Sequence, residues 1–239
     1  MFPLRDINPT LHTPVATWWL IGINVLAWVF IQGLGGEVAM AKSLCQFGLI
    51  PADLLGSAPR NAVIPVSDTL ACTLQDSRPL LTLLSHMFMH GGWFHVITNM
   101  WFLYIFGDNV EDALGASRFV MFYLLCGLAA ALTQIMANAT ALIPMVGASG
   151  AIGGVLGAYA RLFPQAKVVT LIPLGFYFFT TELPAIAMLG YWFFLQLAGG
   201  IPALSSTGGG VAFWAHVGGF IAGLMLVGVF GRRDAPYEY

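Results

Sequence analysis

The chain has 239 residues, of which 58% are hydrophobic and only 8% are charged, and its mean hydropathy is +0.81. Because about a quarter of the residues in a soluble domain are charged, this composition excludes an ordinary soluble protein and indicates a chain that lies within a membrane. A net charge of -2 offers no strongly basic surface, so a nucleic-acid partner is not expected.

Apolar stretches that approach the length needed to cross a bilayer, about 20 residues, follow one another along the chain. Six are predicted to be membrane-spanning helices: residues 15–34, 93–106, 119–138, 148–163, 183–197 and 211–230. The second is short unless the apolar stretch 80–90 also lies at membrane depth, and the aromatic stretch 176–179 could extend the fifth. These features predict an all-α polytopic membrane protein with one membrane domain over residues 15–230.

Three polar segments flank or interrupt the predicted spans: an N-terminal segment 1–14, a long loop 35–80 and a tail 231–239. Lysine and arginine near the ends of spans favour the cytoplasmic side. With both termini in the cytoplasm, that side would hold Arg5, Arg118, Arg161, Lys167, Arg232 and Arg233, and the loop 35–80 would carry Lys42, Arg60 and Arg78 outside. We therefore expect cytoplasmic termini, and the compact layout without a targeting peptide favours a bacterial plasma membrane.

Three cysteines leave one question open. Cys126 lies in an apolar stretch and is predicted to be a small buried hydrophobic residue. Cys45 and Cys72 lie in the long loop, and neither belongs to a C-x-x-C pattern that would indicate zinc or redox chemistry. The two could form a disulfide if the loop faces an oxidising compartment, and the sequence does not decide between paired and free thiols.

The fourth and sixth spans carry a serine and a histidine on matching glycine faces. Ser149 lies in the small-residue sequence GASG, and His216 lies in AHVGGFIAG with Gly219 and Gly223 at positions i+3 and i+7. Glycine faces let two helices approach closely, so the pair could meet. Small residues such as Gly147 also leave room for a substrate backbone beside the serine, and we expect Gly147 to contribute to substrate binding.

Such a pair suits nucleophilic catalysis, because serine needs an adjacent base and a buried imidazole stays neutral and able to accept a proton. The fourth and sixth spans contain no Asp or Glu; the nearest acids are expected in a cytoplasmic turn (Asp108, Glu111 and Asp112) and near the cytoplasmic side (Glu182). We therefore predict a Ser149–His216 dyad without a carboxylate third member. The structural alternatives are a helix-capping serine and a histidine bonded to a backbone carbonyl.

His95 and Asn99 share one face of the second span, where both could donate hydrogen bonds to an oxyanion. The alternative role for this pair is hydrogen bonding between helices. His86 and His90 raise the possibility of zinc, but the protease motif needs Glu after the first histidine, and Met87 stands there. We therefore predict no metal and no cofactor, with His86 and His90 supporting the loop through hydrogen bonds.

Taken together, the motifs resemble the rhomboid family of intramembrane serine proteases. The resemblance covers roughly residues 80–230 and rests on HGGWFHVITN, GDNVEDALG, GASG and AHVGGFIAG, in the family's order. The second of these matches the pattern G-x-x-x-E-x-x-x-G through Gly107, Glu111 and Gly115.

The resemblance implies a six-helix fold with Ser149 as nucleophile, His216 as general base, and His95 and Asn99 in an oxyanion hole. It also implies that the fifth span and the loop 199–210 gate lateral access, and that the substrates are single-span membrane proteins. One departure is Gly153, where many relatives carry an aromatic residue against which the histidine packs. Trp214, Tyr159 or another span is expected to orient His216 instead.

Two other functions fit a polytopic membrane protein. A catalytically silent rhomboid-like protein would bind membrane clients, but such relatives usually lack the serine or the histidine, and both are present here. A small transporter or channel would be expected to carry charged residues at mid-span, or interrupted helices in two related halves. Neither pattern is visible, and the oligomeric state is not indicated by the sequence.

Overall fold

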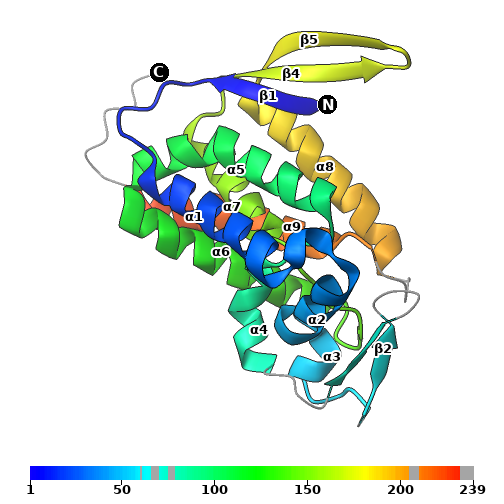
Figure 1. Ribbon diagram of the computed structural model, residues 1–239. Coiled ribbons are helices and arrows are strands. Elements are labelled where there is room, and N and C mark those ends of the chain that lie inside the picture. Colours follow the sequence, from blue (N-terminus) through cyan, green and yellow to red (C-terminus); the bar gives the residue numbers. More distant parts are fainter. Residues whose placement is uncertain (60, 66–69, 75–78, 205–209, 232–239) are drawn as a thin grey trace.

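A computed structural model describes residues 1–59, 61–65, 70–74, 79–204 and 210–231. Six long helical segments form a bundle, with short helices at one end and a three-stranded sheet at the other (Figure 1). The long segments are α1 (Val15–Leu26) with the π-helix η1 (Ala27–Ile31), α5 (Trp93–Leu114), α6 (Ala116–Ala137), α7 (Ser149–Leu162), α8 (Ala185–Ala203) and α9 (Phe213–Phe230).

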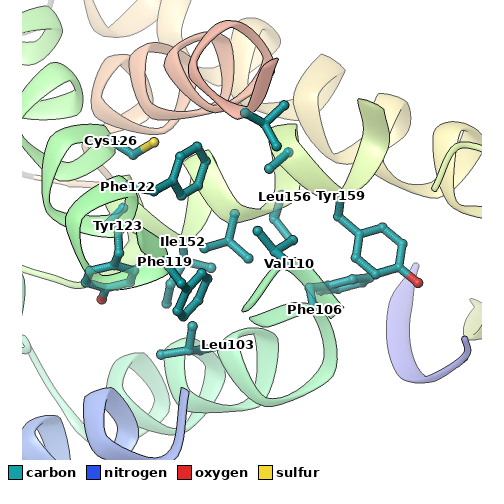
Figure 2. Close-up of a cluster of buried hydrophobic side chains, with 14 of the residues drawn as sticks. Leu103, Phe106, Val110, Phe119, Phe122, Tyr123, Cys126, Ile152, Leu156 and Tyr159 are labelled. Atoms are coloured by element: carbon teal, nitrogen blue, oxygen red, sulfur yellow. The ribbon is translucent and has the colours of Figure 1, made fainter. Parts of the chain in front are cut away.

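Helix α7 is the central element of the bundle, and every residue from Gly150 to Ala160 is buried. A helix covered on all sides can be apolar throughout, and its many Gly and Ala residues allow neighbouring backbones to come close. Around it, aromatic side chains of α5, α6 and α7 form the core shown in Figure 2, including Phe106, Phe119, Phe122 and Tyr159. Cys126 is free and buried in this cluster, as predicted.

The glycine faces of α7 and α9 pack backbone against backbone. A Cβ atom added to Gly219 would collide with the carbonyl oxygen of Gly150, and one added to Gly223 would collide with that of Gly154. The sequence-based prediction that these two faces meet is therefore confirmed. This close approach brings the first turn of α7 beside the first turn of α9.

Three of the described helices are long and apolar enough to cross a membrane by length and composition: α6, α8 and α9. The segment Val15–Ile31 is apolar but shorter than that limit. Helix α7 has only 14 residues, and α5 carries three acidic residues toward its end. The molecule is thus mostly helical with at least three candidate spans, and the count of six spans stays a prediction.

The prediction of an all-α chain is wrong at the end of the bundle shown at the top of Figure 1. Strands β1 (Phe2–Ile7), β4 (Lys167–Leu174) and β5 (Tyr177–Pro184) form an antiparallel sheet in the order β1-β4-β5. The β-branched sequence around residues 168–170 favours a strand, and Gly175, with φ of +60°, starts the two-residue turn of a hairpin. The stretch 176–179 therefore belongs to this hairpin, and α8 begins only at Ala185.

The acidic residues assigned to a turn lie instead in the last turns of α5, which continues to Leu114. The Glu111 carboxylate accepts hydrogen bonds from the backbone N–H groups of Ala16 and Thr17, at 2.8 and 2.7 Å, and from the Thr17 hydroxyl at 2.8 Å. Those N–H groups belong to the first turn of α1 and have no partner within the helix. Through these hydrogen bonds, the buried Glu111 of α5 caps the start of α1.

We expect Glu111→Ala to lower the free energy of unfolding by about 1.5–3 kcal/mol, because it leaves buried donors without their charged acceptor. Thermal unfolding of the detergent-purified protein measures the change. Glu182→Ala is the matched control, because Glu182 forms an exposed ion pair with Lys167 at 3.0 Å, and such pairs contribute little. Equal unfolding temperatures for the two variants would contradict the capping role.

The long loop is more ordered than its composition suggests. It contains the 3-10 turn η2 (Gly33–Gly35) at its start, α2 (Glu37–Phe47), α3 (Pro51–Leu54) and the paired strands β2 (Val63–Pro65) and β3 (Ala71–Thr73). Helix α4 (Pro79–Ser85) and η4 (His86–Phe88) then lead to α5. A disulfide joins Cys45 to Cys72, which answers the question that the sequence left open.

Some sequence-based expectations fall on residues outside the described part of the chain. These are the basic residues Arg60, Arg78, Arg232 and Arg233, most of the tail 231–239, and residues 205–209 of the loop between α8 and α9.

Candidate active site

Ser149 is the first residue of α7, and its hydroxyl lies against the His216 imidazole of α9. The Ser149 Oγ to His216 Nε2 distance is 2.8 Å, and both side chains are partly buried. Gly147, two residues before Ser149, has φ of +130°, a conformation that a residue with a Cβ rarely adopts. This bend turns the chain sharply into α7 and leaves the serine at the end of the helix.

The second ring nitrogen of His216 contacts a residue that sequence reasoning missed. His216 Nδ1 lies 2.8 Å from Gln196 Oε1, while Gln196 Nε2 donates to the Trp192 carbonyl at 3.2 Å. The Trp192 carbonyl can only accept, so the Gln196 amide nitrogen must face it and the Gln196 amide oxygen must face the histidine. Because that oxygen also only accepts, His216 Nδ1 must carry the proton. Nε2 then has a free lone pair directed at the Ser149 hydroxyl. A lone glutamine within the apolar stretch 183–197 was the available signal, because polar groups in membrane helices are costly.

The His216 ring packs against α8. Its centroid lies 5.9 Å from that of Trp192, with 35° between the ring planes. On the α7 side, a Cβ at Gly153 would come 3.0 Å from the His216 carbonyl oxygen, so backbone rather than a side chain fills that position. Of the residues expected to orient His216, Trp214 donates to the Gly200 carbonyl instead. Tyr159 donates its hydroxyl to Asp6 at the far end of α7. Another span, α8, therefore provides the aromatic contact.

His95 of α5 stands on the other side of Gly147. A Cβ at Gly147 would lie 2.7 Å from His95 Nε2 and 3.3 Å from Ser149 Oγ, so the histidine is close to the serine. The Gly91 N–H donates to His95 Nδ1 at 3.2 Å. This bond makes Nδ1 the acceptor in the neutral ring, so Nε2 carries the hydrogen and is a donor facing the serine.

Asn99 lies one turn further along α5 and is buried. Its side-chain Nδ2 makes no hydrogen bond to any described residue, although such a donor normally finds a partner when buried. Asn99 lines the same cavity as Ser149, His95 and His216. The two predicted donors therefore do share one cavity with the serine, as their i, i+4 spacing suggested.

His86 and His90 behave differently from each other. His86 Nδ1 lies 2.7 Å from the carbonyl oxygen of Thr82, four residues earlier in α4, so this bond is local and does not reach the loop 35–80 as predicted. The His90 ring makes no hydrogen bond to a described residue but packs edge-on against His95, with centroids 5.2 Å apart. The Gln32 side-chain amide holds the His90 backbone, because Nε2 donates to the His90 carbonyl and Oε1 accepts from the His90 N–H.

The cavity has a volume of about 710 Å³ and extends from the serine toward Phe2 at the start of β1. Phe94, Phe102 and other residues of α5 line one wall, and Trp192 and Gln196 of α8 line the other. A hydroxyl in contact with an imidazole, together with two further polar side chains in the same apolar cavity, is the set of groups that acyl transfer on an apolar peptide requires.

Known protein families and curated proteins include sequences similar to this chain. The family model of the Rhomboid domain matches residues 77–233, more than half of the chain. The chain is 29% identical over 149 residues to "Rhomboid protein 1, mitochondrial" of Saccharomyces cerevisiae, covering 61% of this chain and 40% of that protein.

Two further relatives come from other lineages. The chain is 28% identical over 167 residues to "RHOMBOID-like protein 1" of Arabidopsis thaliana, covering 66% of this chain and 38% of that protein. It is 29% identical over 226 residues to "Rhomboid protease GluP" of Bacillus subtilis, covering 92% of this chain and 37% of that protein. The matched part of the chain thus spans about two-fifths of the length of these curated relatives.

Proposed function

Because the chain belongs to the rhomboid family, we propose that it is an intramembrane serine endopeptidase with Ser149 as nucleophile and His216 as general base. The observation that carries this proposal is the 2.8 Å contact between Ser149 Oγ and His216 Nε2 at the end of a cavity large enough for a peptide segment. One relative is itself named a rhomboid protease.

The proposed reaction has two halves. In the first, His216 Nε2 takes the hydroxyl proton while Ser149 Oγ attacks the scissile carbonyl carbon and forms a tetrahedral oxyanion. The C–N bond then breaks, and His216 returns the proton to the leaving amine. In the second, a water loses a proton to His216 and attacks the acyl-enzyme, and Ser149 Oγ leaves with that proton. The protonated Nδ1 of His216 keeps Nε2 available for each transfer.

The oxyanion would be held by donors that are already in place. Nε2–H of His95, Nδ2–H₂ of Asn99 and the backbone N–H of Ser149 at the start of α7 could all point to one oxygen. The unpartnered Asn99 donor supports this role, because a donor without a partner costs free energy unless a substrate supplies one. We assign Gly147 to substrate binding, since its missing Cβ leaves room beside His95 and Ser149.

The substrates would be single-span membrane proteins, whose extended segment enters between α5 and α8. An apolar cavity between two helices suits such a segment better than a soluble peptide. We place both termini in the cytoplasm of a bacterium and six spans in its plasma membrane. The Cys45–Cys72 disulfide supports an outward-facing loop, because such bonds persist in oxidising compartments.

Reconstitution into liposomes with a generic single-span substrate tests the proposal. Wild-type protein is expected to release two substrate fragments, and the cut should map within or beside the substrate's membrane segment by mass spectrometry. Binding of the substrate without any fragment, by protein with an intact fold, would instead favour a client-binding rhomboid-like protein.

A further inference from the structure

Helix α8 holds both groups that orient His216, namely the Trp192 ring and the Gln196 amide. The two residues are spaced i, i+4 and so lie on one face of α8, toward α9. Gln196 is buried and makes a second hydrogen bond to the Trp192 carbonyl, so its side chain is fixed at both ends. Helix α7, in contrast, offers only backbone at Gly153.

The position of α8 also determines the width of the cavity. Trp192 and Gln196 line the wall opposite His95 and Asn99, and α8 lies at the edge of the bundle (Figure 1). Much of its other surface is apolar and exposed, including Phe194, Leu195 and Ile201. A substrate that displaces α8 would therefore also displace the acceptor that fixes the His216 tautomer.

We infer that Gln196 is a positioning residue that makes the dyad competent only when α8 is packed against α9, an inference that rests on the proposed protease function. With α8 in place, Gln196 Oε1 accepts the Nδ1 proton and leaves Nε2 free for Ser149. With α8 displaced, the imidazole loses this partner, can take the other tautomer and is free to rotate. The contact between Gln196 of α8 and His216 thus links the position of α8 to the ability of His216 to act as a base.

Gln196→Met and Gln196→Glu test this role as a matched pair, since both keep the length of the side chain. Gln196→Met removes the acceptor and should lower kcat about tenfold to hundredfold with little change in KM, which is the range of loss for residues that orient metal-binding histidines. Gln196→Glu keeps an acceptor and should retain activity at alkaline pH. The acidic limb of the pH–rate profile of this variant should move to higher pH, because a carboxylate beside His216 favours the protonated imidazole, which cannot act as a base.

The same assay separates the possible failures. Wild-type cleavage together with an unchanged kcat for Gln196→Met would overturn the positioning role alone. Equal losses in both variants, with lowered unfolding temperatures and an unchanged pH profile, would reduce Gln196 to a packing residue and also overturn it. A wild-type protein that cleaves nothing would refute the proposed function instead.

The β4–β5 hairpin ends in an uncharged, largely aromatic tip whose side chains are exposed. Leu174, Phe176, Tyr177 and Phe178 are exposed by 61, 100, 82 and 66%, respectively. The hairpin's charged pair, Lys167 and Glu182, lies near its base. Large apolar side chains grouped in this way mark an interaction surface.

The hairpin is continuous with a candidate membrane span, since β5 ends at Pro184 and α8 begins at Ala185. Its base is therefore fixed at the level where α8 would leave the hydrocarbon. Aromatic side chains are favoured at this membrane–water interface. We propose that the hairpin tip inserts into the headgroup region of the bilayer and anchors the β5 end of α8.

A fluorophore sensitive to polarity, attached at Phe176→Cys in lipid nanodiscs, tests the anchor. Its emission should shift to the blue and be quenched more by shallow than by deep spin-labelled lipids. Phe194→Cys on the exposed face of α8 is the deep control, and Lys42→Cys on exposed α2 is the aqueous control. Emission like that of Lys42→Cys would overturn the proposal. A blue shift that appears only after another protein is added, and not in lipid alone, would also overturn it.

Discussion

Ser149→Ala and His216→Ala are each expected to lower the cleavage rate about a thousandfold or more, because the hydroxyl and its base act as one unit. His216 Nε2 is the base that contacts the serine hydroxyl, with 2.8 Å between Oγ and Nε2. The double variant should be no slower than either single variant. Initial rates of substrate cleavage in liposomes provide the measurement.

The unfolding temperature separates loss of the nucleophile from loss of the fold. Ser149→Ala should unfold at nearly the wild-type temperature, because within the described part of the chain the Ser149 hydroxyl forms one hydrogen bond, to His216. Additive losses in the double variant would mean that the two residues act separately. Substantial cleavage by Ser149→Ala would exclude this serine as the nucleophile.

Gly223→Ala is expected to prevent α7 and α9 from packing, although it adds only one methyl group. The new Cβ would overlap the Gly154 carbonyl oxygen, which is helix backbone and cannot move aside as a flexible side chain could. Overpacking of this kind costs about 1–3 kcal/mol or more. The loss should appear as a lower unfolding temperature, less monodisperse protein and lost cleavage, since the shift separates Ser149 from His216.

Gly190→Ala is the control for this substitution. Gly190 also lies within a helix, α8, but a Cβ there meets nothing within 4 Å. Alanine is a better helix former than glycine, so this variant should be at least as stable as the wild type. Equal stability of Gly223→Ala and Gly190→Ala would contradict the backbone contact between α7 and α9.

The parts of the fold that the sequence predicted well are those with a repeated pattern. The glycines at Gly219 and Gly223 and the small residues of α7 indicated a close helix pair, and the structure has that pair. The disulfide could not be decided, because it depends on the path of the chain between Cys45 and Cys72. The hairpin was missed because its aromatic residues resemble a continuation of the next apolar helix.

Within the candidate site, sequence reasoning found the residues that belong to motifs and missed Gln196, which belongs to none. Ser149, His216, His95 and Asn99 line one cavity, as expected from their motifs. Gln196 belongs to no motif, and its contact with His216 depends on how α8 crosses α9. Gly153 did indicate that α7 lacks an aromatic support, but only the structure assigns that support to Trp192.

The central claim is that His216 activates Ser149 as a nucleophile, and covalent labelling tests it most directly. A fluorophosphonate should react when Ser149 Oγ attacks phosphorus, fluoride leaves and His216 takes the proton. Peptide mass spectrometry of the wild type should place the adduct on Ser149, and His216→Ala should show almost none. An adduct on another serine, or equal labelling of Ser149 without His216, would contradict the account.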